Sequence, residues 1–185
     1  MIPRIVEESP EALEQYATVP IRFLVRARHV VASPEAGSGT EEPVNPPYEY
    51  DYDLLDHPKC WRQWDLGTWG FLAAFDGATR VGGAAIAFRT PDLGLLEGRP
   101  DLACLWDIRV RPEHRGHGIG TLLFQAAKSW ALNRGAREMK IETQDINVPA
   151  CRFYMRQGCR LTAANPGVYE RHPHQVQLFW TTPLA

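Results

Sequence analysis

A glycine-rich turn between a strand pattern and an amphipathic helix constrains this chain more than any other feature. Residues Ala103–Pro112 (ACLWDIRVRP) read as a strand, the turn Glu113–Thr121 (EHRGHGIGT) follows, and a helix is predicted from about Gly118 to Arg134. The apolar residues of this helix recur at the i, i+3, i+4, i+7 spacing of one helix face. They are Ile119, Leu122, Leu123, Ala126, Ala127, Trp130 and Ala131. A strand, a glycine turn and a helix in this order indicate an α/β protein.

This turn has the features of an anion site. The first N–H groups of a helix lack partners, and the helix dipole favours a phosphate there. A dinucleotide fingerprint G-x-G-x-x-G fails, because Gly116 and Gly118 would require a glycine at Thr121. A Walker loop fails too, since no Gly-Lys-Ser/Thr follows. A plain connecting turn without a ligand remains the alternative.

The rest of the second half alternates strand and helix. Glu138–Gln144 (EMKIETQ) reads as a strand, and Asn147 caps a helix that runs to Gly158. Two more strands are predicted near Cys159–Ala163 and His174–Thr182. A strand–helix–strand succession implies a parallel strand pair.

A hairpin precedes this half. Trp69–Asp76 and Thr79–Thr90 read as two strands around the turn Gly77-Ala78. Gly82 and Gly83 inside the second strand suggest a bulge or a close backbone approach. The sheet is therefore predicted to be mixed, with antiparallel and parallel neighbours.

The first 65 residues are less regular. Ser9 is predicted to cap a short helix, and Ile21–Val31 reads as a strand. Residues 32–47 are rich in Pro, Gly, Ser and Glu and are predicted to form a loop, whereas Tyr48–Asp65 is predicted to hold one or two short helices. This part of the chain fixes no chemistry by itself.

Composition excludes several classes of protein. The 185 residues suit one domain, and 44% hydrophobic with 23% charged residues is typical of globular chains. Twenty basic against twenty-two acidic residues give a net charge of −2, which argues against nucleic acid as a partner. No apolar run reaches the roughly 18–20 residues of a membrane span, and the acidic N-terminus is unlike a secretory signal. Four cysteines without C-x-x-C spacing are typical of free thiols in the reducing cytoplasm, which is the predicted location. The six histidines do not have the spacing of a metal site.

Two segments together resemble a known superfamily. RGHGIG (Arg115–Gly120) is similar to the pyrophosphate loop of the GNAT N-acetyltransferases, and IETQDINVPACRFYMRQGC (Ile141–Cys159) resembles their later block, except that Cys159 replaces the usual Phe. The resemblance covers about Trp69–Arg160. It implies a single-domain α/β GNAT fold over residues 1–185, with a mixed central sheet, helices on both faces and a splayed parallel strand pair. Residues 69–182 would form its core and residues 1–65 a variable acceptor-side region.

The same resemblance implies acetyl-CoA as co-substrate, without a metal. Backbone N–H groups of the turn would hold its pyrophosphate. The residues expected there are Arg115, Gly116, His117, Gly118, Ile119, Gly120 and Thr121. The N–H of Ile108 would polarise the thioester oxygen. Val110 and Asn147 would hold the pantetheine arm.

Three residues are candidates for the chemistry. Tyr154, twelve residues after Glu142, resembles the family's tyrosine that protonates the leaving thiolate. An alkylamine with a pKa of about 10.4 is mostly protonated at pH 7, so a base assists the attack. Glu142 resembles the glutamate base of acetyltransferases that act on N-terminal amines. Asp107 is the rival base, because strand alternation turns it away from Trp106 and Ile108. The choice between the two carboxylates stays open, as do packing roles for all three residues.

The acceptor is less constrained. The run ETQDINVPACRFY resembles streptothricin acetyltransferases. The acceptor that this resemblance favours is a small cationic amine, such as a streptothricin-like antibiotic. Six acids and three tyrosines between residues 41 and 56 suggest a cage for such a cation, or else a solvated acidic loop. An acetyltransferase of protein N-termini or lysines and a non-catalytic acyl-CoA-binding module are the alternatives. Members of the superfamily often dimerise, so a homodimer is a further expectation, whereas a membrane partner is not expected.

Overall fold

The computed structural model describes residues 3–31 and 39–185. The chain forms two compact units. Unit 1 comprises residues 1–21, 51–139 and 183–185, and unit 2 comprises residues 22–50 and 140–182. The predicted glycine turn lies in unit 1, whereas Asn147 and the helix that it caps lie in unit 2.

Four antiparallel strands form the sheet of unit 1. Its strands follow in the order β1 (Arg4–Glu8), β4 (Gly70–Asp76), β5 (Thr79–Phe88) and β6 (Leu102–Val110). The predicted hairpin is confirmed, because β4 and β5 pair around Gly77. Strand β1 was not predicted from the sequence. Its RIVEE pattern offers only Ile5 and Val6 as apolar residues, and its pairing with β4 defines it.

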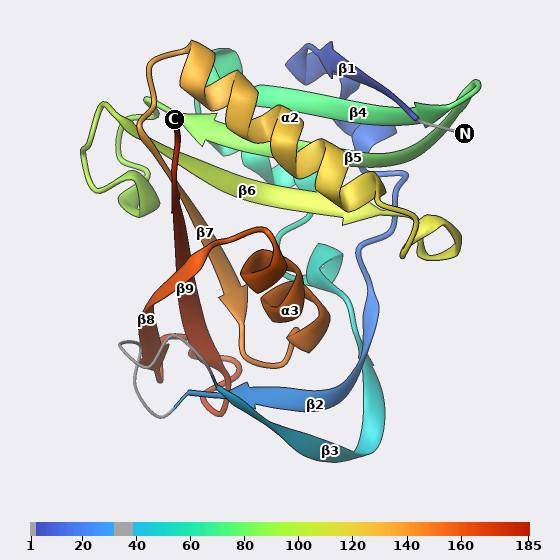
Figure 1. Cartoon of the computed structure of the whole chain (residues 1–185), viewed down its shortest axis with the longest axis vertical. Coiled ribbons are helices and arrows are strands. Elements are labelled where there is room, and N and C mark those ends of the chain that lie inside the picture. The colour runs from blue at the N-terminus through green and yellow to red at the C-terminus, as the bar shows by residue number, and fades with distance from the viewer. Residues whose placement is uncertain (1–2, 32–38) are drawn as a thin grey trace. The chain divides into compact units, whose positions relative to one another are not determined.

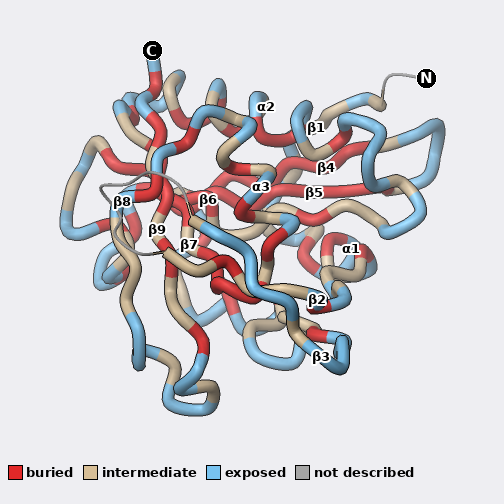
Figure 2. Tube along the Cα trace, turned by 60° about the horizontal axis from the view of Figure 1, so that its bottom comes forward, coloured by how far each residue is buried: buried red, intermediate tan, exposed pale blue. Residues whose placement is uncertain are grey.

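Two adjacent glycines of β5 admit helices to opposite faces of this sheet. A Cβ on Gly82 would lie 3.1 Å from Leu123 of α2 (Ile119–Asn133), and a Cβ on Gly83 would lie 2.6 Å from Tyr16 of α1 (Leu13–Tyr16). Helix α2 crosses β4, β5 and β6 in Figure 1. The close approach predicted for the glycines is confirmed, and β4 and β5 are buried along most of their length (Figure 2).

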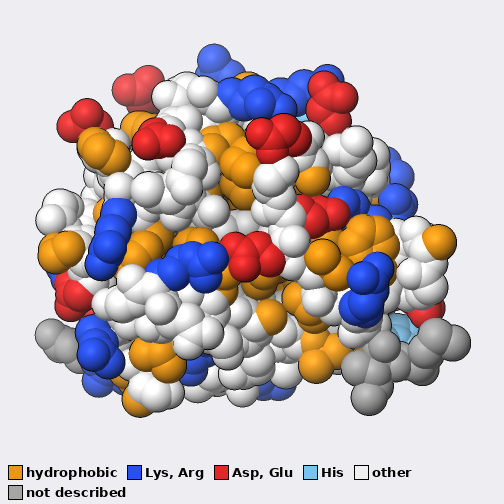
Figure 3. Space-filling view, turned by 90° about the horizontal axis from the view of Figure 1, so that it is seen from above, with side chains coloured by type: hydrophobic (Ala, Val, Ile, Leu, Met, Phe, Trp, Pro, Cys, Tyr) orange, Lys and Arg blue, Asp and Glu red, His pale blue; other side chains and the backbone are white. Residues whose placement is uncertain are grey.

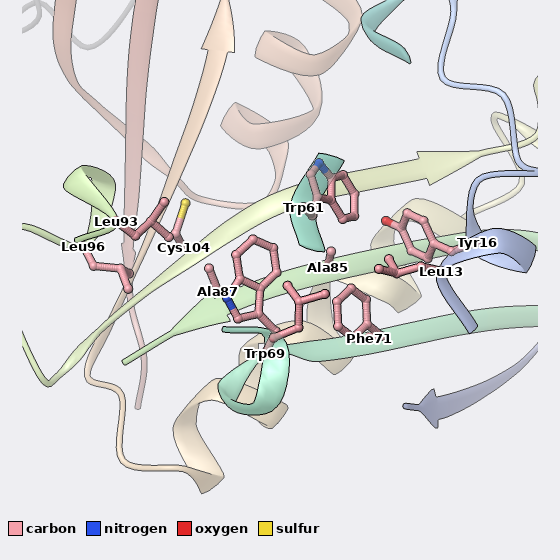
Figure 4. Packing of buried hydrophobic residues seen from close by; sticks show 11 residues of the cluster. Leu13, Tyr16, Trp61, Trp69, Phe71, Ala85, Ala87, Leu93, Leu96 and Cys104 are labelled. Carbon is pink, nitrogen blue, oxygen red and sulfur yellow. The ribbon is translucent and has the colours of Figure 1, made fainter. Parts of the chain in front are cut away.

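The face that carries α1 holds an aromatic cluster (Figure 4). Trp61, Trp69 and Phe71 pack there with Tyr16, in ring contacts of 5.7–6.4 Å. Two short 3-10 helices, Tyr52–Leu54 and Pro58–Gln63, lie within Tyr48–Asp65, where one or two short helices were predicted. All the 3-10 turns of the described residues are Pro10–Ala12, Tyr52–Leu54, Pro58–Gln63, Leu66–Thr68, Gly94–Leu96 and Pro112–His114.

A β-bulge in β6 corrects the alternation predicted around Asp107. Ala85 pairs with Asp107 but the next residue, Ile86, pairs with Leu105, so Trp106 is an extra residue. Trp106 packs on the aromatic cluster, and Asp107 accepts a hydrogen bond from Tyr16 of the same cluster. The expectation that Asp107 faces away from Trp106 is therefore wrong, because a bulge shifts the side-chain alternation by one residue.

Unit 2 contains a hairpin that was not predicted, because its second strand is rich in Pro and Glu. Strand β2 (Phe23–Val30) pairs with β3 (Thr40–Tyr50), so the loop predicted for residues 32–47 is wrong from Thr40 onward. Residues 32–38 of that prediction lie outside the described residues. The register passes from Val25–Tyr48 to Ala27–Pro43, which leaves Pro46 and Pro47 in the irregular stretch between the two pairs. Prolines, which lack an N–H, are tolerated at such places in a strand.

The remaining elements of unit 2 follow the prediction closely. Strand β7 (Glu138–Gln144) begins in unit 1 and continues in unit 2, and α3 spans Val148–Arg156. Strands β8 (Arg160–Pro166) and β9 (Val176–Pro183) form an antiparallel pair.

The strand order confirms the predicted fold class. One mixed sheet has the order β1-β4-β5-β6-β7-β9-β8, and β2-β3 is a separate pair. Within unit 1 the N–H groups of Arg137 and Glu138 both donate to the carbonyl of Asp101, so β6 and β7 start side by side and run parallel. This is the α/β arrangement expected from strand, glycine turn, helix and strand.

The surface carries charges of both signs. On the face shown in Figure 3, Lys and Arg side chains are interspersed with Asp, Glu and apolar side chains. Among residues 3–31 and 39–185, no helix is long and apolar enough to cross a membrane.

Candidate active site

The glycine turn of unit 1 joins β6 to α2 as predicted. Gly116 and Gly118 have φ angles of +79° and +82°, a left-handed conformation that favours glycine. Gly118 is the N-cap of α2 and, as a glycine, has no side chain that could cap the first N–H groups of this helix. The turn is exposed, and Arg115 Nε donates to the Val110 carbonyl across it at 2.9 Å. The first N–H groups of α2 therefore lie beside an exposed turn, a geometry that suits an anionic ligand.

Asp107 lies in a buried ion-pair network. Its Oδ1 accepts hydrogen bonds from Tyr16 Oη at 2.5 Å and from Arg109 Nε at 2.8 Å, and its Oδ2 accepts from Arg109 Nη2 at 2.8 Å. Arg109, whose side chain is 1% exposed, also donates to both carboxylate oxygens of Asp53 and to the Val19 carbonyl. Both oxygens of Asp107 are thus already hydrogen-bonded.

The electrostatics of this network favour fixed charges. Burial opposes ionisation of Arg109, but the charges of Asp107 and Asp53 outweigh it and raise the pKa of the guanidinium above its usual value. Burial and the Asp107 charge raise the pKa of the Tyr16 hydroxyl well above its usual value. At neutral pH the network therefore contains a neutral phenol and a charged arginine.

A second carboxylate of unit 1, Asp56, binds two indoles. Its Oδ2 accepts hydrogen bonds from Trp61 Nε1 at 2.9 Å and from Trp106 Nε1 at 3.1 Å. Burial, together with the nearby charge of Asp107, raises the pKa of Asp56. Sequence spacing could not reveal this contact, because Trp106 is 50 residues away and the bulge decides where its indole points.

The acidic segment of residues 41–56 is divided between internal partners. Asp53 and Asp56 are engaged as described above, and Asp51 Oδ1 caps the N–H of Asp53 at 3.0 Å. In unit 2, Glu41 pairs with Arg152 and Glu49 with Arg22. Asp51, Asp53 and Asp56 are therefore bound to groups of the protein itself, whereas Glu41, Glu42 and Glu49 are exposed, as the solvated alternative predicts for them.

Glu142, the other candidate base, has a different environment in unit 2. The residue is partly exposed on β7, and its Oε1 accepts a hydrogen bond from Tyr169 Oη at 2.6 Å. Tyr169 lies in the connection between β8 and β9, and the sequence analysis had assigned it no role. Among the described residues no cation pairs with Glu142, so this carboxylate has one neutral donor where Asp107 has an arginine.

Asn147 and Tyr154 occupy α3 as predicted. Asn147 Oδ1 accepts a hydrogen bond from the Ala150 N–H at 3.1 Å and caps the helix. Tyr154 is 5% exposed, and its ring lies 6.4 Å from that of Trp180. Burial raises the pKa of the neighbouring Cys151 to about 12, so its thiol stays protonated at neutral pH and is a poor nucleophile.

The predicted site residues fall into two groups. Unit 1 holds Asp107, Ile108, Val110, Arg115, Gly116, His117, Gly118, Ile119, Gly120 and Thr121, and unit 2 holds Glu142, Asn147 and Tyr154. Ile108 and Val110 lie on β6 opposite Ala84 and Gly82 of β5. The glycine turn thus belongs to unit 1, and the helix and strand that carry Tyr154 and Glu142 belong to unit 2, apart from the first residues of β7.

Comparison with known proteins identifies this arrangement. The sequence profile of the acetyltransferase (GNAT) family matches residues 38–159. The chain belongs to the GNAT acetyltransferase family. The match begins upstream of the region in which motifs alone carried the resemblance and includes β3, the strand that composition concealed.

A curated relative and two solved structures extend the comparison. Streptothricin acetyltransferase of Escherichia coli is 36% identical over 83 residues, which are 43% of this chain and 48% of that protein. This GNAT chain therefore spans about half the length of the curated relatives it matches. The crystal structure of a nourseothricin acetyltransferase has a TM-score of 0.77 at 23% identity and covers 100% of both chains. A Bacillus anthracis str. Ames protein in complex with acetyl coenzyme A has a TM-score of 0.78 at 23% identity and covers 98% of this chain and 99% of that one. Likeness at this identity supports the GNAT fold.

Proposed function

We propose that this GNAT protein transfers the acetyl group of acetyl-CoA directly to a primary amine of a small cationic acceptor. The observation that carries the proposal is the family match over residues 38–159, which includes both the glycine turn and the Glu142–Tyr154 block. The likeness in fold to a protein solved with acetyl coenzyme A supports the choice of acyl donor.

The glycine turn is proposed to hold the pyrophosphate of acetyl-CoA. Residues Arg115–Thr121 fit this group, because Gly116 and Gly118 leave the backbone open and the N-cap of α2, Gly118, has no side chain to occupy the first N–H groups. Arg115 would add a cation there. The backbone at Ile108 and Val110 and the amide of Asn147 would bind the pantetheine arm and the thioester oxygen. Acetyl-CoA supplies an activated acyl carbon and a thiolate leaving group.

Two side chains of unit 2 are proposed to move protons. Glu142 would accept the proton that the amine loses as its nitrogen attacks, and the Tyr154 hydroxyl would donate a proton to the leaving sulfur. Asp107 would serve as a structural anion, because Arg109 and Tyr16 already bond to both of its oxygens. The protonated Cys151 thiol agrees with direct transfer rather than an acyl-cysteine intermediate.

A streptothricin-like antibiotic is the named acceptor candidate. The support is the name of the relatives that match this GNAT chain at 36% and 34% identity over segments of 83 and 80 residues. Those segments are 43% and 42% of the chain, and the acceptor class is therefore the part of the proposal that the experiment below tests first.

The experiment measures thiol release from acetyl-CoA with four acceptors: streptothricin, spermidine, kanamycin and a lysine peptide. Saturable turnover of streptothricin with kcat/KM above about 10⁴ M⁻¹s⁻¹ supports the antibiotic as acceptor. Preference for the lysine peptide would replace it with a protein acceptor, and cofactor binding without turnover of any amine would point to a non-catalytic acyl-CoA-binding module.

Substitution of Tyr154 tests the assigned chemistry. Tyr154→Phe is expected to lower kcat at least about tenfold while the Kd for acetyl-CoA, from calorimetry, changes little. Thr162→Val, which removes an exposed hydroxyl of β8 that donates to the Phe179 carbonyl, is the control and is expected to keep wild-type kcat. An unchanged kcat in Tyr154→Phe would remove the assignment.

A further inference from the structure

We propose that Tyr169 is a positioning residue for Glu142, and that the β2–β3 hairpin holds the loop that carries it. This inference rests on the proposed function, because it needs Glu142 as the base. Tyr169 Oη donates to Glu142 Oε1 at 2.6 Å, across 27 residues of sequence. It gives the hairpin, which the sequence left without a role, a place in the chemistry.

The first step is the orientation of the carboxylate. The hydrogen bond from the phenol restrains Oε1, and Oε2 is left as the oxygen that would accept a proton from the amine. Among the described residues no second hydrogen bond to Glu142 competes with this one. A base works only when its lone pair points at the proton that it removes, so a fixed rotamer contributes directly to the rate.

The second step is how the loop is held. Backbone hydrogen bonds from His172 to Tyr169 and from Gln175 to His172 shape residues 169–175 into successive turns. Tyr50, at the end of β3, contacts both turns. Its hydroxyl donates to Gln175 Oε1 at 3.2 Å, and its ring lies edge-on to His172 at 5.8 Å. Gln175 is 6% exposed, so this anchor is buried.

Strand β2 supplies a second anchor to the same loop. Arg28 Nη2 donates to the His174 carbonyl, and its Nε pairs with Asp145 at 3.2 Å. Asp145, whose side chain is 3% exposed, also accepts the Val176 N–H through Oδ1 at 2.9 Å. Both strands of the hairpin thus form hydrogen bonds to the loop after Tyr169, and Tyr169 in turn forms a hydrogen bond to Glu142.

The kinetic test compares Tyr169→Phe, Tyr50→Phe and Thr162→Val in steady-state assays with acetyl-CoA and whichever of the four acceptors is turned over best. Tyr169→Phe is expected to lower kcat about tenfold with the KM for acetyl-CoA unchanged. Tyr50→Phe is expected to lower kcat by a smaller factor, and Thr162→Val, which removes an exposed hydroxyl of β8, is expected to match the wild type.

A double variant separates positioning from a general structural effect. In a Glu142→Gln background, Tyr169→Phe is expected to have no further effect on kcat, since no base remains to be oriented. If Glu142→Gln alone leaves kcat intact, the base assignment fails and this inference fails with it. If Glu142→Gln abolishes turnover but Tyr169→Phe does not change kcat, only the positioning role is overturned.

Hydrogen exchange tests the anchoring without any acceptor. Amides of residues 167–175 are expected to exchange faster in Tyr50→Phe than in the wild type, and at the wild-type rate in Thr162→Val. Unchanged exchange in Tyr50→Phe would overturn the role of the hairpin.

Discussion

Two acidic side chains on neighbouring strands in sequence order, Asp107 of β6 and Glu142 of β7, have opposite surroundings. Asp107 is 7% exposed and bonded through both oxygens to a buried arginine and a phenol. Glu142 is partly exposed and bonded through one oxygen to a single phenol. The carboxylate of Asp107 thus links elements of unit 1 through both of its oxygens, whereas the described residues bond to only one oxygen of Glu142.

The difference shows why carboxylate position alone does not identify a base. When one partner of a buried carboxylate–guanidinium pair loses its charge, the charge of the other partner is left uncompensated. A carboxylate with one neutral donor can accept a proton without stranding another charge. The environment of the oxygens therefore favours Glu142 over Asp107 as the candidate base.

The largest expected effect comes from breaking the network around Asp107. Arg109→Leu leaves Asp107 and Asp53 buried without a cation and is expected to lower the free energy of unfolding by about 3–5 kcal/mol. Arg99→Leu is the matched control: Arg99 also pairs with two acids, Asp101 and Glu138, but is 38% exposed, so about 0–1 kcal/mol is expected. Denaturant unfolding of both variants measures the difference, and equal losses would contradict a special role for the buried network.

A smaller effect is expected at Asp56, next to the same network. Asp56→Ala removes the acceptor of two indole N–H groups and is expected to cost about 1–3 kcal/mol. Asp56→Asn keeps an acceptor and removes the charge. The pKa of Asp56 is raised in the folded protein. Ionisation of Asp56 therefore lowers the free energy of unfolding as the pH rises from the unfolded-state pKa to the folded-state pKa. Asp56→Asn is therefore expected to be neutral or slightly stabilising at pH 7. A large loss in thermal-unfolding measurements of Asp56→Asn would show that the charge itself is needed.

The smallest effect concerns His29, a buried titratable group of unit 2. Among the described atoms its two ring nitrogens have no hydrogen-bond partner, and burial lowers its pKa despite the opposing charges of Glu41 and Asp145. A base with a lowered folded-state pKa contributes stability above its unfolded pKa of about 6.5 and loses it as the pH falls below that value. His29→Leu is expected to reduce the stability lost between pH 7 and pH 5 by up to about 1 kcal/mol. An unchanged pH dependence would contradict this assignment.

The sequence predicted the local elements well. The periodicity of α2, the Asn147 cap of α3 and the limits of β7 all agree with the structure. These features depend on residues that are neighbours along the chain. The glycine turn was also readable, because a left-handed conformation needs glycine at positions such as 116 and 118.

Contacts between distant residues could not be predicted in this way. The Arg109–Asp53 pair joins residues 56 apart, and the Tyr169–Glu142 hydrogen bond joins residues 27 apart. The bulge at Trp106 and the proline-containing strand β3 each contradict a local rule because pairing with a partner strand decides them. The sequence therefore offered two candidate bases, Glu142 and Asp107. The structure shows that their hydrogen-bond partners differ.

The most direct measurement compares the kcat of Glu142→Gln with that of Asp107→Asn, using purified protein whose folding is checked by thermal unfolding. Glu142→Gln is expected to lower kcat about 100-fold or more with its melting temperature unchanged. Asp107→Asn is expected to lower the melting temperature but to keep kcat, per folded protein, within about threefold of the wild type. The reverse pattern, a stable but inactive Asp107→Asn beside an active Glu142→Gln, would contradict the account and make Asp107 the base.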